Sequence, residues 1–378
     1  MGFRILNLIP INILFLIYGL ERGGAELRLL DFARYFPEDV KIHFCVTTDN
    51  LALLPYFQEC TENIQVIPIG KSYLSANKVW KLFKYVKANR IPVINSFDLK
   101  DLVISTAIRL LSGTKVKAVF HSVNMLHHYH RRHKALFWVL IKLNDAVICN
   151  STQSKDLMRR FHVPHKRVRV INNGIDTNRF VKTDNDTQNS RKKYNLETNV
   201  IVLGTIANFR KIKNYPFLLR AFQILTQKKP YLRLICVGGG YLLNGIKAMA
   251  KKYGIDQKML FVGYSDDVVE YLSLMDIFVL CSLREGFPNV LLQAMSMELP
   301  VITSDVGGCP EIIDNMTNGI LYPSNDLDNF IEAVEMLIED MNFASKLGVN
   351  ARRTVVEKFS LNRMVKDYIT FFRELSKF

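Results

Sequence analysis

Cysteine is scarce in this sequence, and nothing in its spacing indicates disulfide or redox chemistry. The six cysteines are scattered without a C-x-x-C pair, and most stand inside apolar runs such as LICVGG and FVLCS. We interpret them as small buried hydrophobic side chains. This usage fits a reducing compartment best, so a cytoplasmic location is predicted.

The chain also lacks an uncharged run long enough to span a bilayer. The segment Ile5–Leu20 carries no charge, but it is shorter than the roughly 18–20 residues a spanning helix needs, and it contains Asn7, Pro10 and Asn12. YGLERGGAE follows it in place of the small-residue cleavage site of a signal peptide. We predict a buried parallel strand over INILFLIY and no membrane span, and assign no conformation to MGFRILNLIP.

Acidic residues are sparse in the first half of the chain. Residues 1–190 hold 27 Lys and Arg against 15 Asp and Glu, so +12 of the formal charge of +15 lies there. A basic half favours phosphate groups or an anionic membrane surface as partners, whereas an excess that merely maintains solubility is the alternative. No nucleic-acid partner is predicted.

What is abundant is an alternation of short apolar strands with amphipathic helical stretches. The strand candidates are INILFLIY, VKIHFCVTT, IPVINSF, VKAVFHS and DAVICNS, then VIVLGTI, LRLICVGG, KMLFVGY, DIFVLCS, PVITSD and GILYP. This order predicts an α/β protein with two doubly wound Rossmann-like domains, over residues 1–185 and 186–360, and a C-terminal helix over 361–378 that packs back toward the first domain. The polar stretch Val181–Asn199 is predicted to be a linker or an exposed loop. Ligands of such sheets bind at the carboxyl ends of strands, so a cleft between the domains is the expected site.

Two glycine clusters stand where a strand gives way to a helix. Gly23 and Gly24 in ERGGAE allow backbone N–H groups to approach a phosphate or sugar, although a Gly-Gly turn is common there. VGGG, over Val237–Gly240, does not match the dinucleotide fingerprint G-x-G-x-x-G. It either lines a pocket or makes a tight turn.

Histidines gather in HSVNMLHHYHRRHK, where a zinc site and a basic amphipathic helix are both conceivable. The five are His121, His127, His128, His130 and His133. No Cys, Asp or Glu completes a ligand set at metal spacing, so we favour the helix and predict no metal. His121 differs, because it directly follows the strand VKAVF and is expected to face the cleft.

Two further stretches indicate an anion. Arg210, Lys211 and Lys213 follow the strand VIVLGTI and suit a diphosphate, although one of them is expected to be only solvated. In EGFPNVLLQAM, Pro288 fits the first position of a helix, whose free N–H groups and dipole favour an anion. Glu285 lies just before that helix, where a carboxylate suits hydroxyl groups or a sugar that develops positive charge.

With these motifs the chain resembles a family-4 retaining glycosyltransferase of the GT-B fold. The resemblance runs from GGAE through INNGID to EGFPNVLLQAMSMELPVITSDVGGCPEII, which matches the family's E-x7-E block and the G-x-P-E turn after it. It implies a nucleotide sugar held mainly by the C-terminal half, an acceptor on the N-terminal half, and no metal.

The resemblance also assigns roles to single residues. Glu285 would lie beside the sugar ring, His121 would contact the transferred sugar, and Lys213 would bind the diphosphate. Further donor contacts are implied for Gly23, Gly24, Asn208, Arg210, Gly263, Tyr264, Gly286, Phe287, Pro288, Asn289, Val290, Leu291 and Gln293.

The chain departs from the family pattern at three positions. Asn208 stands where the family often has Arg, and Arg210 would take over the role of that Arg. Glu298 replaces a frequent Gly at a turn. Gln293 replaces the second glutamate, which hydrogen-bonds ribose hydroxyls in the family. Because a hydrogen bond to a charged group contributes about 1.5–3 kcal/mol and a neutral one about 0.5–1.5 kcal/mol, we expect this change to weaken donor binding by about 1 kcal/mol.

The sequence therefore predicts a cytoplasmic, metal-independent retaining glycosyltransferase that uses a UDP- or GDP-sugar. A lipid-linked or glycan acceptor of bacterial surface-polysaccharide assembly is expected, with peripheral contact of LHHYHRRHKALFWVLIK to the inner, anionic face of the membrane. A nucleotide-sugar epimerase of the same fold and a catalytically silent nucleotide-sugar-binding subunit are the alternatives.

Overall fold

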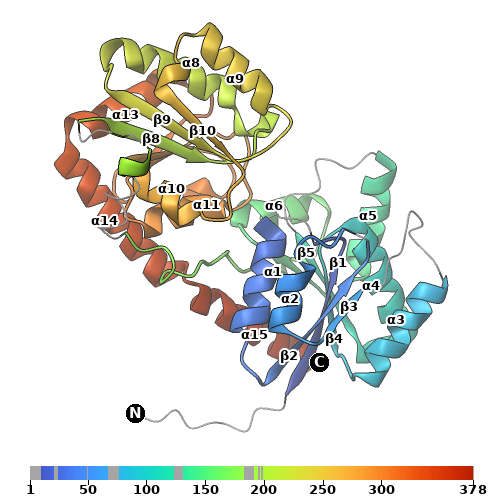
Figure 1. The fold of residues 1–378 in the computed structure, drawn as a ribbon. Coiled ribbons are helices and arrows are strands. Elements are labelled where there is room, and N and C mark those ends of the chain that lie inside the picture. Colours follow the sequence, from blue (N-terminus) through green and yellow to red (C-terminus); the bar gives the residue numbers. More distant parts are fainter. Residues whose placement is uncertain are drawn as a thin grey trace, which may run out of the picture. The chain divides into compact units, whose positions relative to one another are not determined.

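The computed structural model describes residues 10–20, 24–48, 50–66, 76–122, 131–182, 191–194, 196 and 199–377. They form two compact units, Met1–Asn172 with Met364–Phe378 (the N-terminal unit) and Asn173–Arg363 (the C-terminal unit) (Figure 1). The boundary falls at Asn172/Asn173, ahead of the expected 185/186, and the last helix belongs to the N-terminal unit from Met364 onward.

The N-terminal unit is built on a seven-stranded parallel sheet of order β3-β2-β1-β4-β5-β6-β7. Its strands are β1 (Ile11–Ile17), β2 (Val40–Val46), β3 (Ile64–Val66), β4 (Val93–Ser96), β5 (Lys117–Ser122), β6 (Ala146–Cys149) and β7 (Val168–Val170). Its helices are α1 (Gly24–Tyr35), α2 (Leu54–Cys60), α3 (Ala76–Ala88), α4 (Leu99–Ser112), α5 (Arg131–Leu143), α6 (Thr152–Arg160) and α15 (Leu361–Ser376).

Both faces of this sheet are covered, which explains why β1 is apolar at every position except Asn12. Successive strand residues point to opposite faces. Leu14 and Leu16 pack in one cluster with residues of α3 and α4. Phe15 points the other way, with ring centroids 5.7 Å from Phe32 of α1 and 6.0 Å from Phe372 of α15. The helix α15 is therefore part of the core of the N-terminal unit.

The C-terminal unit repeats the plan with a six-stranded parallel sheet of order β10-β9-β8-β11-β12-β13. Its strands are β8 (Ile201–Ile206), β9 (Leu232–Val237), β10 (Met259–Gly263), β11 (Ile277–Leu280), β12 (Val301–Ser304) and β13 (Ile320–Tyr322). Its helices are α8 (Tyr215–Lys228), α9 (Leu243–Lys252), α10 (Val268–Leu274), α11 (Asn289–Ser296), α12 (Cys309–Ile312), α13 (Leu327–Glu339) and α14 (Met341–Lys358). Two parallel sheets covered by helices confirm the predicted fold class.

Burial confirms the interpretation of the cysteines as hydrophobic side chains. Five of the six are buried as free thiols, and Cys60 is half-buried. Burial raises the pKa of the Cys281 and Cys309 thiols to about 12. They therefore stay protonated and act as small core residues.

No helix in the described part of the chain is both long and apolar enough to cross a bilayer.

Candidate functional site

The most concentrated set of predicted site residues lies in the C-terminal unit, in the loop between β11 and α11. Glu285 of this loop is largely covered, with 10% of its side chain exposed. Its Oε1 atom lies 2.5 Å from Lys213 Nζ, and the hydroxyl of Ser282 donates to the same oxygen at 2.5 Å. The structure thus brings Lys213 and Glu285 together, which sequence reasoning had assigned to different parts of a ligand.

Lys213 reaches this loop because the chain turns tightly after β8. Residues Lys211–Lys213 form a 3-10 turn that ends at Asn214, a residue in the left-handed conformation (φ 55°). The N–H of Leu283 donates to the carbonyl of Ile212 at 2.8 Å, which fastens this turn to the Glu285 loop. Among the three predicted cations, Arg210 and Lys211 are exposed and make no side-chain hydrogen bond or ion pair with the described residues. Lys213 alone is drawn into the cluster.

Gly307 and Gly308, in the loop after β12, support the Glu285 loop from behind. A Cβ atom at Gly307 would lie 1.8 Å from the carbonyl oxygen of Glu285, and one at Gly308 would lie 2.3 Å from that of Gly286. Gly307 also has a φ of 62°, in the left-handed region. Glycine is needed at both positions because the two backbone segments are in direct contact.

Helix α11 begins one residue later than predicted. Pro288 is the N-cap with extended backbone (φ −75°, ψ 109°), and Asn289 is the first helical residue. Pro288 has no N–H, and the N–H of Leu291 donates to the Pro288 carbonyl at 3.1 Å, so these two residues of the predicted donor set are not free donors. The backbone N–H groups of Gly286, Phe287, Asn289 and Val290 donate no hydrogen bond within the described residues. Free N–H groups at and just before the start of a helix suit an anion.

Asn173 fixes this helix start and was not predicted as a site residue. Its buried side chain donates to the carbonyl of Phe287 at 3.0 Å and to Asn289 Oδ1 at 2.7 Å. Ile175 then pairs with Ser360. These contacts explain why the C-terminal unit begins at Asn173, before the polar linker. The motif INNGID was the available signal, although its letters do not show what the amide would bind.

Gln293 and Glu298 lie on and just after α11. Gln293 is half-buried, and its side chain makes no hydrogen bond to a described residue. Glu298 adopts φ 59°, which explains why glycine is frequent there in the family. Its carboxylate lies 3.6 Å from the Arg352 guanidinium.

The predicted residues at the neighbouring strand ends differ in their surroundings and exposure. Cβ atoms at Gly238 and Gly240 would lie 2.2 Å from the Ala207 carbonyl oxygen and 2.7 Å from that of Phe209, so VGGG is a tight turn packed on the chain after β8. Gly263 has φ 83°, with nothing within 4 Å of a Cβ. Tyr264 is 49% exposed and donates to Asp266, and Asn208 is exposed.

His121 is in the interior of the N-terminal unit, which corrects the expectation that it faces an open cleft. It occupies β5, where Phe120 points toward α5 and His121 therefore points to the opposite face. Its ring stacks on Phe97 at 5.0 Å, and the hydroxyl of Tyr368 on α15 lies 3.2 Å from Nε2. The side chain is completely buried, and burial, with the charge of Arg28 as a lesser cause, lowers its pKa well below the usual value.

Some predicted positions lie partly or wholly outside the described residues. Gly23, His127, His128 and His130 fall outside them, and Gly24 is the first residue of α1. Within the described chain, no three His, Cys, Asp or Glu side chains form a group that would hold a metal ion.

The C-terminal unit therefore carries a cation, a carboxylate and free helix N–H groups in one loop cluster. Such a cluster suits a ligand with both a phosphate and hydroxyl groups. Ser282 was also missed as a site residue, because a serine at a strand end carries no signal of its own.

Two family models match the chain. "Glycosyltransferase Family 4" matches residues 22–179, and "Glycosyl transferases group 1" matches residues 186–354. Over 96% of this chain and all of the other, the structure of Anabaena Alr3699/HepE in complex with UDP superposes with a TM-score of 0.87 at 20% identity, which shows a shared fold.

Curated relatives include bacterial enzymes. N-acetyl-alpha-D-glucosaminyl L-malate synthase of Bacillus anthracis is 31% identical over 62% of this chain and 61% of its own length. UDP-Gal:alpha-D-GlcNAc-diphosphoundecaprenol alpha-1,3-galactosyltransferase of Escherichia coli is 27% identical over 80% and 79%. A capsular polysaccharide biosynthesis glycosyltransferase of Staphylococcus aureus is 24% identical over 76% and 70%. With both halves matched by models of the family, the chain belongs to the family-4, group 1 glycosyltransferases and is a glycosyltransferase of the GT-B fold.

Proposed function

We propose that the protein transfers a hexose-type sugar, with retention of configuration, from a UDP- or GDP-sugar bound to the C-terminal unit. The observation that carries this proposal is the convergence of Lys213, Glu285 and the start of α11. Retention is proposed from the family resemblance.

The leaving diphosphate is the proposed ligand of the positive groups. Lys213 supplies a full charge, and the N–H groups of Asn289 and Val290 supply donors at the positive end of the α11 dipole. Arg210 is a second cation within the same turn. Groups already oriented toward the phosphates stabilise the charge that develops as the bond to the sugar breaks. In this proposal protein groups meet that charge without a metal ion.

The carboxylate of Glu285 is the proposed partner of the sugar. An anion beside the ring stabilises the positive charge of an oxocarbenium-like transition state and accepts hydrogen bonds from hydroxyl groups. Gln293 is proposed to bind ribose hydroxyls with its amide, and Gly263 with Tyr264 is proposed to line the base. His121 has no proposed contact with the sugar, because its side chain is buried under α15.

The acceptor is proposed to be a lipid-linked glycan of bacterial surface-polysaccharide assembly. Two curated relatives support this pathway by their names, one specifying a diphosphoundecaprenol substrate and the other capsular polysaccharide biosynthesis. Such an acceptor would hold the enzyme at the membrane surface.

Helix α5 supports the proposed membrane contact, although part of its apolar surface is used for packing. Phe137 and Ile141 are buried against the sheet. Leu136, Val139 and Leu143, spaced to share one side of the helix, are 39%, 50% and 38% exposed. One side of this helix therefore packs against the sheet, and another side is available for the proposed membrane contact.

Further exposed apolar side chains on α5 and at the end of α4 have the composition of an interfacial surface. Trp138 is 42% exposed, with Lys142 Nζ 3.6 Å from its ring centroid. Leu110 and Leu111, at the end of α4, are also more than half exposed. Apolar side chains flanked by lysines insert at the headgroup boundary while the cations meet anionic lipid.

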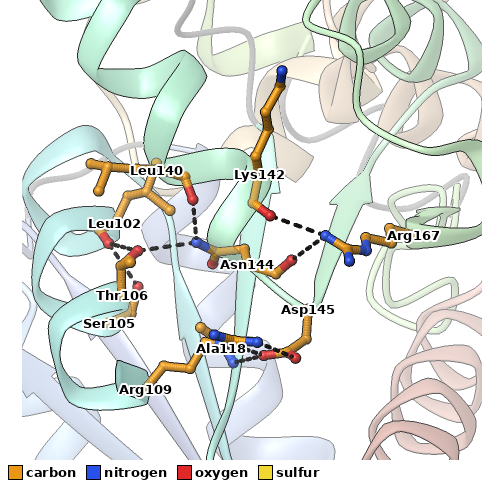
Figure 2. A network of polar contacts seen from close by, with 10 residues as sticks. All are labelled: Leu102, Ser105, Thr106, Arg109, Ala118, Leu140, Lys142, Asn144, Asp145 and Arg167. Carbon is orange, nitrogen blue, oxygen red and sulfur yellow. Dashed lines mark hydrogen bonds and ion pairs between the residues drawn. The ribbon is translucent and has the colours of Figure 1, made fainter. Parts of the chain in front are cut away.

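A polar network joins the C-terminal end of α4 to the end of α5 (Figure 2). Asn144 donates to Thr106 Oγ1 at 3.1 Å and to the Leu140 carbonyl at 3.0 Å. Asp145 accepts from Arg109 and from the Ala118 N–H, and Arg167 donates to the Lys142 carbonyl at 3.0 Å. The exposed apolar residues therefore lie on helices whose ends are held together by hydrogen bonds and an ion pair.

The proposal is tested by incubating the protein with a panel of UDP- and GDP-sugars, with and without a bacterial membrane lipid extract. Transfer to lipid that requires the extract, with the product's anomeric configuration matching the donor's by NMR, is the expected result. Isomerisation of the donor without acceptor would identify an epimerase instead. Binding of a nucleotide sugar with no turnover in the presence of the extract would identify a silent binding subunit.

A further inference from the structure

Ser282 is a buried serine whose hydroxyl is directed at the proposed sugar-binding carboxylate. It follows β11, and its side chain is completely covered. Its Oγ donates to Glu285 Oε1 at 2.5 Å. Its own carbonyl accepts the hydroxyl of Ser304, the last residue of β12, at 2.6 Å. Two neighbouring strands therefore fix the position of this serine.

The two oxygens of Glu285 are not equivalent. Oε1 accepts from both Ser282 Oγ and Lys213 Nζ, each at 2.5 Å. Oε2 accepts no hydrogen bond from any described residue. A lysine on a long, rotatable stem holds a carboxylate only loosely. A short serine side chain, whose own carbonyl is tied to Ser304 of β12, fixes the position of Oε1 more closely.

We propose that Ser282 is the positioning residue of the transfer site: it locks Oε1 of Glu285 so that Oε2 is presented to the sugar. This inference rests on the proposed function, because it assigns the atom of Glu285 that meets the donor. Ser282 acts through Glu285 and touches no substrate. It also keeps the carboxylate in place when a diphosphate draws Lys213 away from Oε1, which a ligand-free ion pair alone would not do.

Ser296 provides a matched control. It is equally buried, lies in the same unit, and donates its hydroxyl to the Phe180 carbonyl at 2.9 Å, away from Glu285. Loss of a buried hydroxyl is common to Ser282→Ala and Ser296→Ala. Only the first removes a donor from the Glu285 carboxylate.

The experiment measures kcat with a saturating nucleotide sugar, the Kd of the nucleoside diphosphate by calorimetry, and the melting temperature. Ser282→Ala should lower kcat about tenfold or more, the loss of one hydrogen bond to a charged group, and leave the Kd within about threefold. Ser282→Cys, with a weaker donor of similar size, should give an intermediate kcat. Ser296→Ala should keep kcat within about twofold of the wild type.

A crystal structure of ligand-free Ser282→Ala gives a second readout that needs no turnover. The Glu285 carboxylate should rotate away from its wild-type position or occupy two conformers. An unmoved carboxylate, an unchanged kcat, or equal losses of kcat in Ser282→Ala and Ser296→Ala would each overturn the assignment. A wild-type protein that transfers no sugar would instead refute the proposed function, and the carboxylate position would still test whether Ser282 orients Glu285.

Discussion

Lys213 Nζ and Glu285 Oε1 lie 2.5 Å apart, although the two residues are separated by 72 positions in the chain. Their side chains are only 20% and 10% exposed, so the pair is shielded from solvent. The cation proposed for the diphosphate and the carboxylate proposed for the sugar therefore neutralise each other in the free protein. Donor binding must compete with this ion pair, and each partner influences the other's ligand.

Glu285→Gln should reduce turnover by orders of magnitude, because a neutral amide stabilises developing positive charge poorly. The same change should leave binding of the nucleoside diphosphate unchanged or tighter, since it removes a negative charge and frees Lys213. Steady-state kinetics and calorimetry measure the two effects separately.

Glu270→Gln is the matched control, because Glu270 lies 2.5 Å from Lys193 in the same unit and outside the site. It should change neither quantity by more than about twofold, because this ion pair, with the Lys193 side chain 62% exposed and that of Glu270 22% exposed, lies away from the loop of Glu285. Full turnover of Glu285→Gln would remove this carboxylate from the mechanism.

The protein should lose stability as the pH falls from 7 to 5, because two buried histidines resist protonation. Burial, with Lys41 as a lesser cause, lowers the pKa of His43 to about 4, and that of His121 is also lowered. In the unfolded chain both titrate near 6.5, so below that pH the unfolded state takes up protons that the folded state excludes. The free energy of unfolding should fall by up to about 1.4 kcal/mol per pH unit for each histidine.

Denaturant unfolding at several pH values checks this slope. His121→Phe, which can still pack on Phe97, should show about half of the wild-type slope of unfolding free energy against pH between pH 6 and 5. Equal slopes in the variant and the wild type would show that His121 does not contribute.

Gly307→Ala should abolish turnover and destabilise the C-terminal unit. Its new Cβ would lie 1.8 Å from the Glu285 carbonyl oxygen, so the site loop must shift. Gly245→Ala is the control, because a Cβ there has nothing within 4 Å and the residue lies inside α9. It should raise stability by about 0.5–1 kcal/mol and preserve turnover. Thermal melts and turnover measurements of both variants test this prediction. An active Gly307→Ala would contradict the close contact of Gly307 with the Glu285 carbonyl.

The exposed side of α5 should bind anionic liposomes in a salt-dependent manner. The protein should sediment with them at low ionic strength and be released as salt screens the lysines. Changing Trp138 and Val139 to Ser should weaken sedimentation, whereas Trp80→Ser should not, although Trp80 is 49% exposed and also has a lysine near its ring. Equal binding to neutral and anionic liposomes, or none to either, would make a soluble acceptor the better proposal.

The sequence predicts the buried strands well, including the short β13, whereas it misses two of the edge strands and the contacts between distant residues. Every strand with four or more residues coincides with an apolar run, because burial on both faces leaves a continuous hydrophobic signal. The edge strand β3 and its counterpart β7 have three residues each and no such signal.

Among the site residues, position along the chain was easier to predict than orientation. Lys213 and Glu285 were found as residues flanking strands and helices, but their mutual contact depends on the sheet order. His121 stands near the carboxyl end of β5, as predicted, but its side chain is buried, because Tyr368 from the far end of the chain packs against it. Ser282 and Asn173 act through hydrogen bonds whose partners only the fold defines.

The central claim, that the Lys213–Glu285 cluster is the donor site, is tested most directly by titrating UDP and GDP into the wild type and Lys213→Ala in a calorimeter. Lys211→Ala, which removes an exposed cation from the same turn, is the control. We predict that one nucleotide binds the wild type, that Lys213→Ala weakens its affinity about tenfold or more, and that Lys211→Ala changes it less than about threefold. A Kd that Lys213→Ala leaves unchanged would contradict the claim and place the diphosphate elsewhere.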